Sequence, residues 1–291
     1  MPIYNLGSIN ADHFYRVPHL PRPGETLAAT SLLRGLGGKG TNMSVAAARA
    51  AAQVLHIGAV GRDGGWARDR LLEYGVDTRH VVTLDATPTG HAVIQVDDHG
   101  ENAILLFPGA NHAISEAAIG TALAEASPGD TLLMQNETNN QLFAARTARS
   151  LDLTVAYAAA PFEITALHGL LPLVDILFLN AVEAGQFEQA TGQSPAGLPG
   201  KRVIVTRGSQ GSTLFDNITG ETRHFPALPV TPVDTTGAGD TFTGYALAAL
   251  DRGLPMPQAI ALATRAAALM VTRHGTADVI PDLKEVQEAR F

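Results

Sequence analysis

Short apolar runs alternate with helical patterns along most of the 291-residue chain, and this alternation constrains the fold more than any other feature of the sequence. The predicted strands are almost entirely apolar and lie at residues 53–61, 131–136, 154–159, 175–180 and 201–208. The predicted helices lie between and around them, at residues 43–52, 66–75, 115–126, 140–151, 181–192, 239–253 and 256–275. Continuous apolar strands separated by helices are typical of a parallel sheet that is covered on both faces. We therefore predict an α/β fold with a mostly parallel central sheet and helices on both faces.

Two segments interrupt this alternation. Residues 11–36 are rich in proline and irregular, and residues 88–107 have the pattern of a β-hairpin that turns at His99 and Gly100. We predict that both form one small sheet, a lid laid over the end of the main sheet; the alternative is a pair of surface excursions. Because no linker or repeat divides the chain, we predict one domain over residues 1–291, with lid segments at about 11–36 and 88–110.

Composition and charge exclude several classes of protein. Hydrophobic residues make up 45% of the chain and charged residues 16%, which indicates a globular protein. The net charge of −8, with no local cluster of Lys and Arg, argues against nucleic acid or an anionic membrane as a partner. The absence of Cys excludes disulfides and thiolate metal sites. No secretory signal and no apolar run of roughly 20 residues is present, so we expect a cytoplasmic protein.

Polar residues follow several of the predicted strands. The stretches concerned are GSINAD (7–12), which follows a first strand at the start of the chain, and MQNET (134–138), LNAVE (179–183) and TRGSQG (206–211). In sheets of this type, ligands bind beyond the carboxyl ends of the strands. We therefore expect these side chains to converge on one cleft.

The stretch DTTGAGDTF at residues 234–242 is the strongest single signal in the chain. Gly237, Ala238 and Gly239 lead directly into a predicted helix, whose first N–H groups can hold a transferring phosphoryl group. Asp240 follows in the first turn, where it could accept a proton from a hydroxyl group. The structural alternative is an Asp that only caps the helix.

The letters GLGGKG at residues 35–40 match a dinucleotide-binding motif, but its context is wrong. The preceding segment is the irregular one, and the next predicted strand ends without an acidic residue. A Walker A loop also fails, because Gly40 follows Lys39 where Ser or Thr is required. The glycines instead form a tight turn that opens a helix at 41–52.

Several residues around these turns could bind a small polar ligand, although each has a structural alternative. Gly38 lets the backbone approach a ligand, and Lys39 and Asn42 supply donors, unless the turn serves packing alone. The candidates that could hydrogen-bond vicinal hydroxyls are Asn10, Asp12 and Glu137, of which the first two are also ordinary turn formers.

Asn180 and Glu183 have the i, i+3 spacing of two side chains on one helix face. Asn180 could cap the helix while Glu183 orients a metal-bound water, but a simple capping box has nearly the same spacing, and the residues alone do not separate the two. The 10 histidines show no metal-ligand spacing.

Taken together and in order, these motifs resemble the ribokinase-like carbohydrate kinases. The ordered set spans the chain and comprises GSINAD, PRPGET, GGKGTN, PGAN, MQNET, LNAVE, TRGSQG and VDTTGAGDTFTG. The resemblance implies an ATP-dependent sugar kinase that is specific for D-ribose and forms homodimers through its lid. A nucleoside or hexose kinase of the family is the first alternative. A non-catalytic sugar-binding or regulatory protein and an NAD-linked oxidoreductase are the others.

The resemblance also implies a role for each motif residue. Asp240 would be the catalytic base, and Gly237, Ala238 and Gly239 the anion hole. The sugar would be held by Asn10, Asp12, Gly38, Lys39, Asn42 and Glu137. Asn180 and Glu183 would order Mg²⁺ and the phosphates, and the nucleotide would lie along Thr206, Gly208, Gly211 and Thr264. Asp234 and the carbonyl of Thr236 would help to hold a monovalent cation, usually K⁺.

The chain departs from the family pattern at four places. Ala158 stands where its best-matching members have an Asn near the phosphates. Val279 replaces a cation-linked Ser, and Thr264 replaces an Asn or His near adenine. A helix expected before residue 201 is missing. These departures bear on nucleotide affinity and K⁺ activation more than on the fold.

Overall fold

The structure is a computed structural model that describes residues 1–291. Its largest element is a nine-stranded sheet in the order β13-β12-β11-β10-β9-β8-β1-β4-β5. Its strands are β1 (Ile3–Leu6), β4 (Val54–Gly61), β5 (Val81–Leu84), β8 (Thr131–Gln135), β9 (Thr154–Ala158), β10 (Ile176–Asn180), β11 (Arg202–Thr206), β12 (Ser212–Asp216) and β13 (Glu221–Phe225). All neighbouring pairs are parallel except β11–β12 and β12–β13. The predicted mostly parallel sheet is confirmed.

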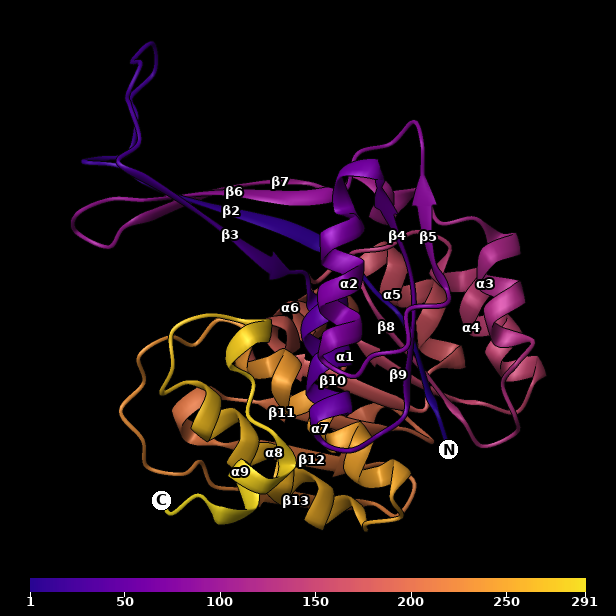
Figure 1. Ribbon diagram of the computed structural model, residues 1–291. Coiled ribbons are helices and arrows are strands. Elements are labelled where there is room, and N and C mark those ends of the chain that lie inside the picture. The colour runs from indigo at the N-terminus through magenta and orange to yellow at the C-terminus, as the bar shows by residue number, and fades with distance from the viewer.

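Helices cover both faces of this sheet (Figure 1). They are α1 (Lys39–Arg49), α2 (Gly65–Glu73), α3 (Glu116–Leu123), α4 (Gln141–Ser150), α5 (Ile164–Leu170), α6 (Ala181–Thr191), α7 (Ala238–Asp251), α8 (Met256–Met270) and α9 (Leu283–Glu288). One buried core joins the sheet to α1, α2, α7, α8 and α9, and a second joins its other face to α3, α4, α5 and α6. Neighbouring strand residues point to opposite faces, so that Ile3 belongs to the first core and Tyr4 to the second.

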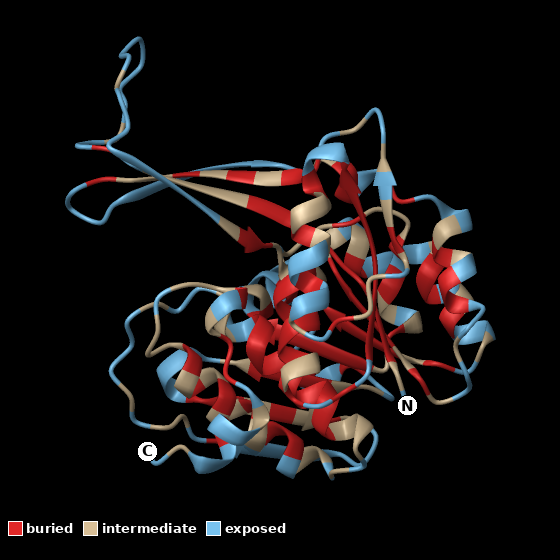
Figure 2. Cartoon of the chain, viewed as in Figure 1, coloured by how far each residue is buried: buried red, intermediate tan, exposed pale blue.

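A separate four-stranded sheet, in the order β3-β2-β6-β7, projects from the main body (Figure 1). Its strands are β2 (Asn10–Arg16), β3 (Ser31–Gly37), β6 (Gly90–Val96) and β7 (Asn102–Phe107). The small sheet predicted from the two interruptions is therefore present, and the β6–β7 turn contains His99 and Gly100 as expected. The far part of the sheet is largely exposed, in contrast to the buried main sheet (Figure 2).

The structure corrects several elements of the sequence interpretation. Residues 11–36, described as irregular although expected to join the small sheet, contain most of two regular strands, β2 and β3, which are paired along their whole length. Helix α1 begins at Lys39 and ends at Arg49. It ends there because Ala51 adopts a φ of 67°, which is incompatible with a right-handed α-helix. Helix α8 ends at Met270, five residues early. The elements β5, α5 and α9 were missed because they are short. The hairpin β12–β13 was missed because β12 buries Ser212 and Asp216 beside Leu214, and β13 is exposed except at Phe225.

Some local predictions are confirmed. Ser115 caps α3 by accepting a hydrogen bond from the N–H of Ala118. Only a short 3₁₀ turn, Pro195–Gly197, lies between α6 and β11, so the helix expected there by resemblance is indeed missing. None of the helices combines the length and the apolar composition needed to span a membrane.

Candidate active site

The turn before α7 has the backbone geometry expected for an anion site. Gly237 precedes the helix with a φ of 77°, a conformation that favours glycine, and the first helical bond runs from the N–H of Thr241 to the carbonyl of Gly237. The N–H groups of Gly239 and Asp240 lie ahead of this bond, where helix N–H groups have no partner within the helix. Ala238 instead donates its N–H to the carbonyl of Thr235 at 3.2 Å.

Asp240 is a buried carboxylate on α7, with 7% of its surface exposed. Asn42 Nδ2, from the first turn of α1, donates to Asp240 Oδ2 at 2.9 Å. The two helices can approach closely because Gly244 packs against α1, where a Cβ would lie 2.6 Å from the carbonyl oxygen of Met43. Burial raises the pKa of Asp240, while the ammonium of Lys39 and the Asn42 amide oppose this. A raised pKa makes this carboxylate a better proton acceptor.

Lys39 provides the positive charge nearest to this group. The Asp240 carboxylate raises the pKa of Lys39, so its ammonium remains charged at neutral pH. Its backbone N–H donates to Glu137 Oε2 at 2.9 Å, and Ser8 Oγ donates to the same oxygen at 2.5 Å. These two hydrogen bonds bring together the residues that follow β1, β3 and β8. The stretches GSINAD and MQNET therefore meet, as their positions after two strands led us to expect.

Asp12 lies on β2, near Glu137. Its side chain packs against Gly37, where a Cβ would lie 1.9 Å from Asp12 Oδ2, so only glycine fits this position of β3. Burial and the neighbouring Glu137 carboxylate raise the pKa of Asp12 to about 7. Next to it, Gly38 has a φ of 97° and lies against Ser8, which brings its backbone to the same corner.

Asn10 begins β2 and is held by Asn111, a residue for which no role was predicted. Asn111 Nδ2 donates to Asn10 Oδ1 at 2.7 Å, and Asn111 Oδ1 accepts from the N–H of Ile9 at 2.9 Å. Ser8 was missed in the same way. Ser8 lies in the motif GSINAD and Asn111 in the motif PGAN. Both are buried polar residues that hold the backbone next to the residues predicted to bind the sugar.

Asn180 and Glu183 form a complete capping box. Asn180 Oδ1 accepts from the N–H of Glu183 at 2.8 Å, and Glu183 Oε2 accepts from the N–H of Asn180 at 2.7 Å. Both side chains nevertheless line a cavity together with Lys39 and Asp240. Burial raises the pKa of Glu183, opposed by the backbone hydrogen bond and by Lys39. The capping alternative is therefore realised, and each side chain keeps one further polar atom for a ligand.

Two adjoining cavities meet at α7. The smaller, of about 270 Å³, contains Lys39, Asn180, Glu183, Gly237, Gly239 and Asp240 in its lining. The larger, of about 700 Å³, is lined by all four predicted nucleotide residues, Thr206, Gly208, Gly211 and Thr264. Gly239, Thr206 and Thr235 line both, so the cavities share a wall at the phosphate turn. Ala158 lines the smaller one, where it contributes a methyl group and no amide.

The predicted cation residues lie beside this turn but line neither cavity. Asp234 Oδ1 accepts from the N–H of Thr236 at 2.9 Å, and Oδ2 accepts from the N–H of Gly275 at 3.3 Å. Although partial burial opposes it, these hydrogen bonds hold the pKa of Asp234 below its ordinary value. Val279, near Gly275, has no side-chain oxygen to offer.

Comparison with known proteins agrees with this geometry. Residues 3–283 match the family described as pfkB family carbohydrate kinase. A ribokinase of Haemophilus influenzae is 36% identical, over 97% of this chain and 96% of its own length. The structure of a ribokinase of Cryptococcus neoformans in complex with ADP is 32% identical, with a TM-score of 0.84, covering 99% of this chain and 98% of that one. A ribokinase of Arabidopsis thaliana complexed with ribose and ATP is 28% identical, with a TM-score of 0.85, covering 99% and 97%.

Proposed function

Since this chain belongs to the pfkB family of carbohydrate kinases, we propose that it phosphorylates D-ribose with ATP, giving D-ribose 5-phosphate and ADP. Membership of the family makes it a phosphotransferase that acts on a sugar hydroxyl group. The observation that carries the proposal is the position of Asp240. This buried carboxylate lies in the first turn of α7, accepts a hydrogen bond from Asn42 and lines the smaller cavity. We place the reaction in the cytoplasm, where ATP is available.

In the proposed reaction, Asp240 accepts the proton of the ribose 5-hydroxyl. The new bond joins that oxygen to the γ-phosphorus, the bond from the γ-phosphorus to the bridging oxygen breaks, and ADP leaves with the electron pair. Such transfers need alignment and charge compensation rather than covalent catalysis. The N–H groups of Gly239 and Asp240 and the ammonium of Lys39 would stabilise the charge on the transferring group.

We assign the larger cavity to the nucleotide and the corner around Asp12 to the sugar. Asn10, Asp12, Asn42 and Glu137 offer the amide and carboxylate groups that bind vicinal hydroxyls. Asn42 Oδ1 is buried and has no hydrogen-bond partner, which fits an acceptor that awaits a sugar hydroxyl. Because Asp12 lies on the small sheet, we propose that this sheet closes over the sugar as a lid and excludes water.

Mg²⁺ would arrive with ATP as part of the substrate. Glu183 keeps one carboxylate oxygen outside its capping box, and Asn180 lies beside it in the smaller cavity. These groups would orient the metal's water ligands in addition to capping α6. The chain has no group of three or more His, Asp or Glu residues that could hold a metal by itself, so the phosphates would supply the direct ligands.

We further propose a monovalent cation site at Asp234 and the carbonyl of Thr236. An ionised carboxylate with a backbone carbonyl suits a hard cation such as K⁺. Replacing KCl by tetramethylammonium chloride should lower turnover several-fold, because the cation adds positive charge beside the phosphate turn. Asp234→Asn should reduce this response to K⁺. Equal rates in both salts would remove the cation site from the account.

The substrate assignment is tested by an ADP-coupled assay over D-ribose, 2-deoxyribose, fructose and nucleosides, with Mg²⁺ and K⁺ present. D-ribose should give the highest kcat/KM, and product analysis should find the phosphate at the 5-position. Preferred turnover of a nucleoside or hexose would contradict the choice of ribose. Sugar binding in calorimetry without turnover would instead support a non-catalytic protein, the alternative that Ala158 favours.

The small sheet also supports a homodimer. In the strand register, Leu33, Phe14, Ile94 and Ile104 lie in one row across the four strands, on the same face as Leu106. Of these, Leu33 is 68% exposed, Ile104 56% and Leu106 62%. We propose that a second copy of this chain covers this apolar face with its own small sheet.

Ile104→Asp should weaken the dimer at least about tenfold, because it places an unpaired carboxylate in the buried contact. Sedimentation analysis over a range of protein concentrations measures this dissociation. Leu72→Asp is the control, since Leu72 is similarly exposed, at 60%, but lies on α2 and not on the small sheet. An unchanged dissociation constant for Ile104→Asp, or a wild-type protein that is monomeric throughout, would contradict the proposed interface.

A further inference from the structure

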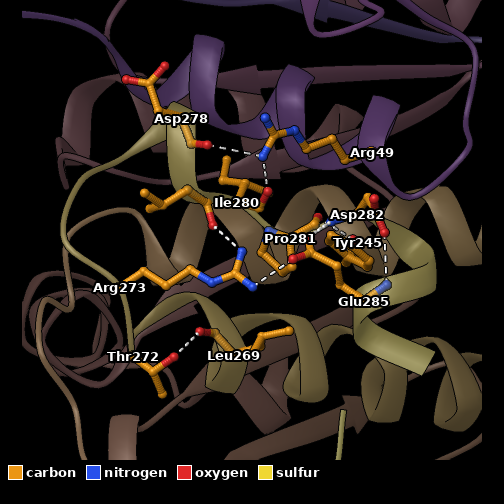
Figure 3. A network of polar contacts seen from close by, with 11 residues as sticks. Arg49, Tyr245, Leu269, Thr272, Arg273, Asp278, Ile280, Pro281, Asp282 and Glu285 are labelled. Carbon is orange, nitrogen blue, oxygen red and sulfur yellow. Dashed lines mark hydrogen bonds and ion pairs between the residues drawn. The ribbon is translucent and has the colours of Figure 1, made fainter. Parts of the chain in front are cut away.

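Residues 271–282, which connect α8 to α9, form a segment that we call the C-terminal bridge. Side chains from two helices, α1 and α7, and from the segment itself hold its backbone carbonyls (Figure 3). Arg49 of α1 donates to the carbonyls of Asp278 and Ile280, and Tyr245 of α7 donates to that of Pro281 at 2.6 Å. Within the segment, Arg273 donates to the carbonyl of Val279 at 3.2 Å. The bridge is thus a fixed part of the structure despite having little regular secondary structure.

Two neighbouring residues of the bridge contact opposite halves of the proposed site. The N–H of Gly275 donates to Asp234 Oδ2 at 3.3 Å, and Asp234 begins the turn that leads to Gly237. The hydroxyl of Thr276 donates to the carbonyl of Leu36 at 3.2 Å, on strand β3. The phosphate turn and the small sheet, which are about 200 residues apart in sequence, are therefore joined through two consecutive residues.

The strand end that Thr276 contacts leads directly into the sugar corner. Leu36 is 2% exposed and precedes Gly37, against which the side chain of Asp12 packs. Gly38 and Lys39 follow, and the N–H of Lys39 donates to Glu137. A shift of the Leu36 carbonyl would therefore move the backbone on which Asp12 and Glu137 are arranged.

We propose that Thr276 is a positioning residue, whose hydroxyl group holds the end of β3 in register with the phosphate turn. It contacts no substrate and acts through Leu36. The effect on turnover rests on the proposed function, whereas the effect on the order of residues 36–40 does not. The hydroxyl is required for this role, since a methyl group at the same place would lie against a carbonyl oxygen without bonding to it.

Thr276→Val is the test, and Thr276→Ser, which keeps the hydroxyl, is the rescue. In steady-state assays with the sugar that the wild type prefers, Thr276→Val should raise the sugar KM about 3- to 10-fold and lower kcat, the expected effect of one lost hydrogen bond at a positioning contact. The KM for ATP should change less than about twofold, because Thr276 does not line the larger cavity and its hydroxyl bonds to Leu36 alone. Thr276→Ser should restore the wild-type values.

Thr272→Val is the matched control. The Thr272 hydroxyl donates to the carbonyl of Leu269 in the last turn of α8, at 2.7 Å (Figure 3). It makes no hydrogen bond to β3. This variant should lose a similar hydrogen bond and leave the sugar KM unchanged.

Hydrogen exchange provides a readout that does not depend on turnover. Amides of residues 36–40 should exchange faster in Thr276→Val than in Thr272→Val or Thr276→Ser. If Thr276→Val keeps the wild-type sugar KM and the wild-type exchange rates, the inference is wrong, even when the wild type is an active ribose kinase. If the wild type phosphorylates no sugar, the proposed function fails, and the exchange rates alone decide the role of Thr276.

Discussion

Asp240→Asn is expected to lower kcat by at least about 10²-fold, the low end of what general acid–base catalysis contributes. The substitution keeps the size of the side chain but removes its ability to accept a proton from the sugar hydroxyl. The Asn42 contact and the N–H groups at the start of α7 remain, so sugar binding should persist. Steady-state rates give kcat, and calorimetry with D-ribose gives the affinity.

A control on the same helix separates this effect from damage to α7. Asp251→Asn changes the last residue of the helix, where the carboxylate pairs with the N-terminal amine of Met1 at 3.0 Å, and should leave kcat unchanged. Turnover near the wild-type rate in Asp240→Asn would show that another group takes the proton. Loss of sugar binding together with turnover would instead indicate a structural role.

Asp12→Asn should have the second largest effect, and it should weaken sugar binding rather than slow phosphoryl transfer. Hydrogen bonds to a charged group contribute more than neutral ones, so we expect the KM for ribose to rise roughly 10- to 100-fold. The loss belongs to ground-state contacts, so kcat should fall much less. Measurement of both constants over a range of ribose concentrations separates the two.

The pH dependence gives the same residue a second signature. Because burial and Glu137 raise the pKa of Asp12 to about 7, its carboxylate form is lost as pH falls through that value. If this form binds the sugar, kcat/KM for ribose should decrease below about pH 7 in the wild type and respond less to pH in Asp12→Asn.

The effect on stability has the opposite sign. The folded protein retains this proton up to about pH 7, while the unfolded chain releases it near the ordinary value of 3.8. Stability therefore decreases as pH rises between these values, and Asp12→Asn should raise the melting temperature of the free protein above pH 7. Asp98→Asn, at an exposed position in the β6–β7 turn, is the control for both measurements.

An unchanged KM for ribose in Asp12→Asn would show that Asp12 does not belong to the sugar site.

The strands that are buried on both faces of the main sheet were predictable from the sequence. The strands β8, β9 and β10 are continuous apolar runs in the sequence and lie in the middle of the sheet, covered on both sides. Strand β3 was not predictable, because Ser31, Leu32, Leu33 and Arg34 are exposed and mix apolar with polar residues without a clear period. Its place is set by pairing with β2, a contact between segments that no local pattern reports.

The site was predictable as a set of residues and less so as a set of contacts. The glycine turn at 237 and the helix beginning after it follow from local sequence, and the structure has both. The bond from Asn42 to Asp240 joins residues 198 positions apart and depends on the packing of α1 against Gly244. The supporting residues Ser8 and Asn111 were missed for the same reason, since a buried Ser or Asn has no distinctive spacing.

The central claim is that Asp240 and the start of α7 act on the two reacting groups at one point. A crystal structure with D-ribose and a non-hydrolysable ATP analogue tests it directly. The ribose 5-hydroxyl oxygen should lie about 2.6–3.2 Å from an Asp240 carboxylate oxygen, with the terminal phosphate bound by the N–H groups of Gly239 and Asp240. A terminal phosphate bound away from this turn, or a ribose whose 5-hydroxyl points away from Asp240, would contradict the account.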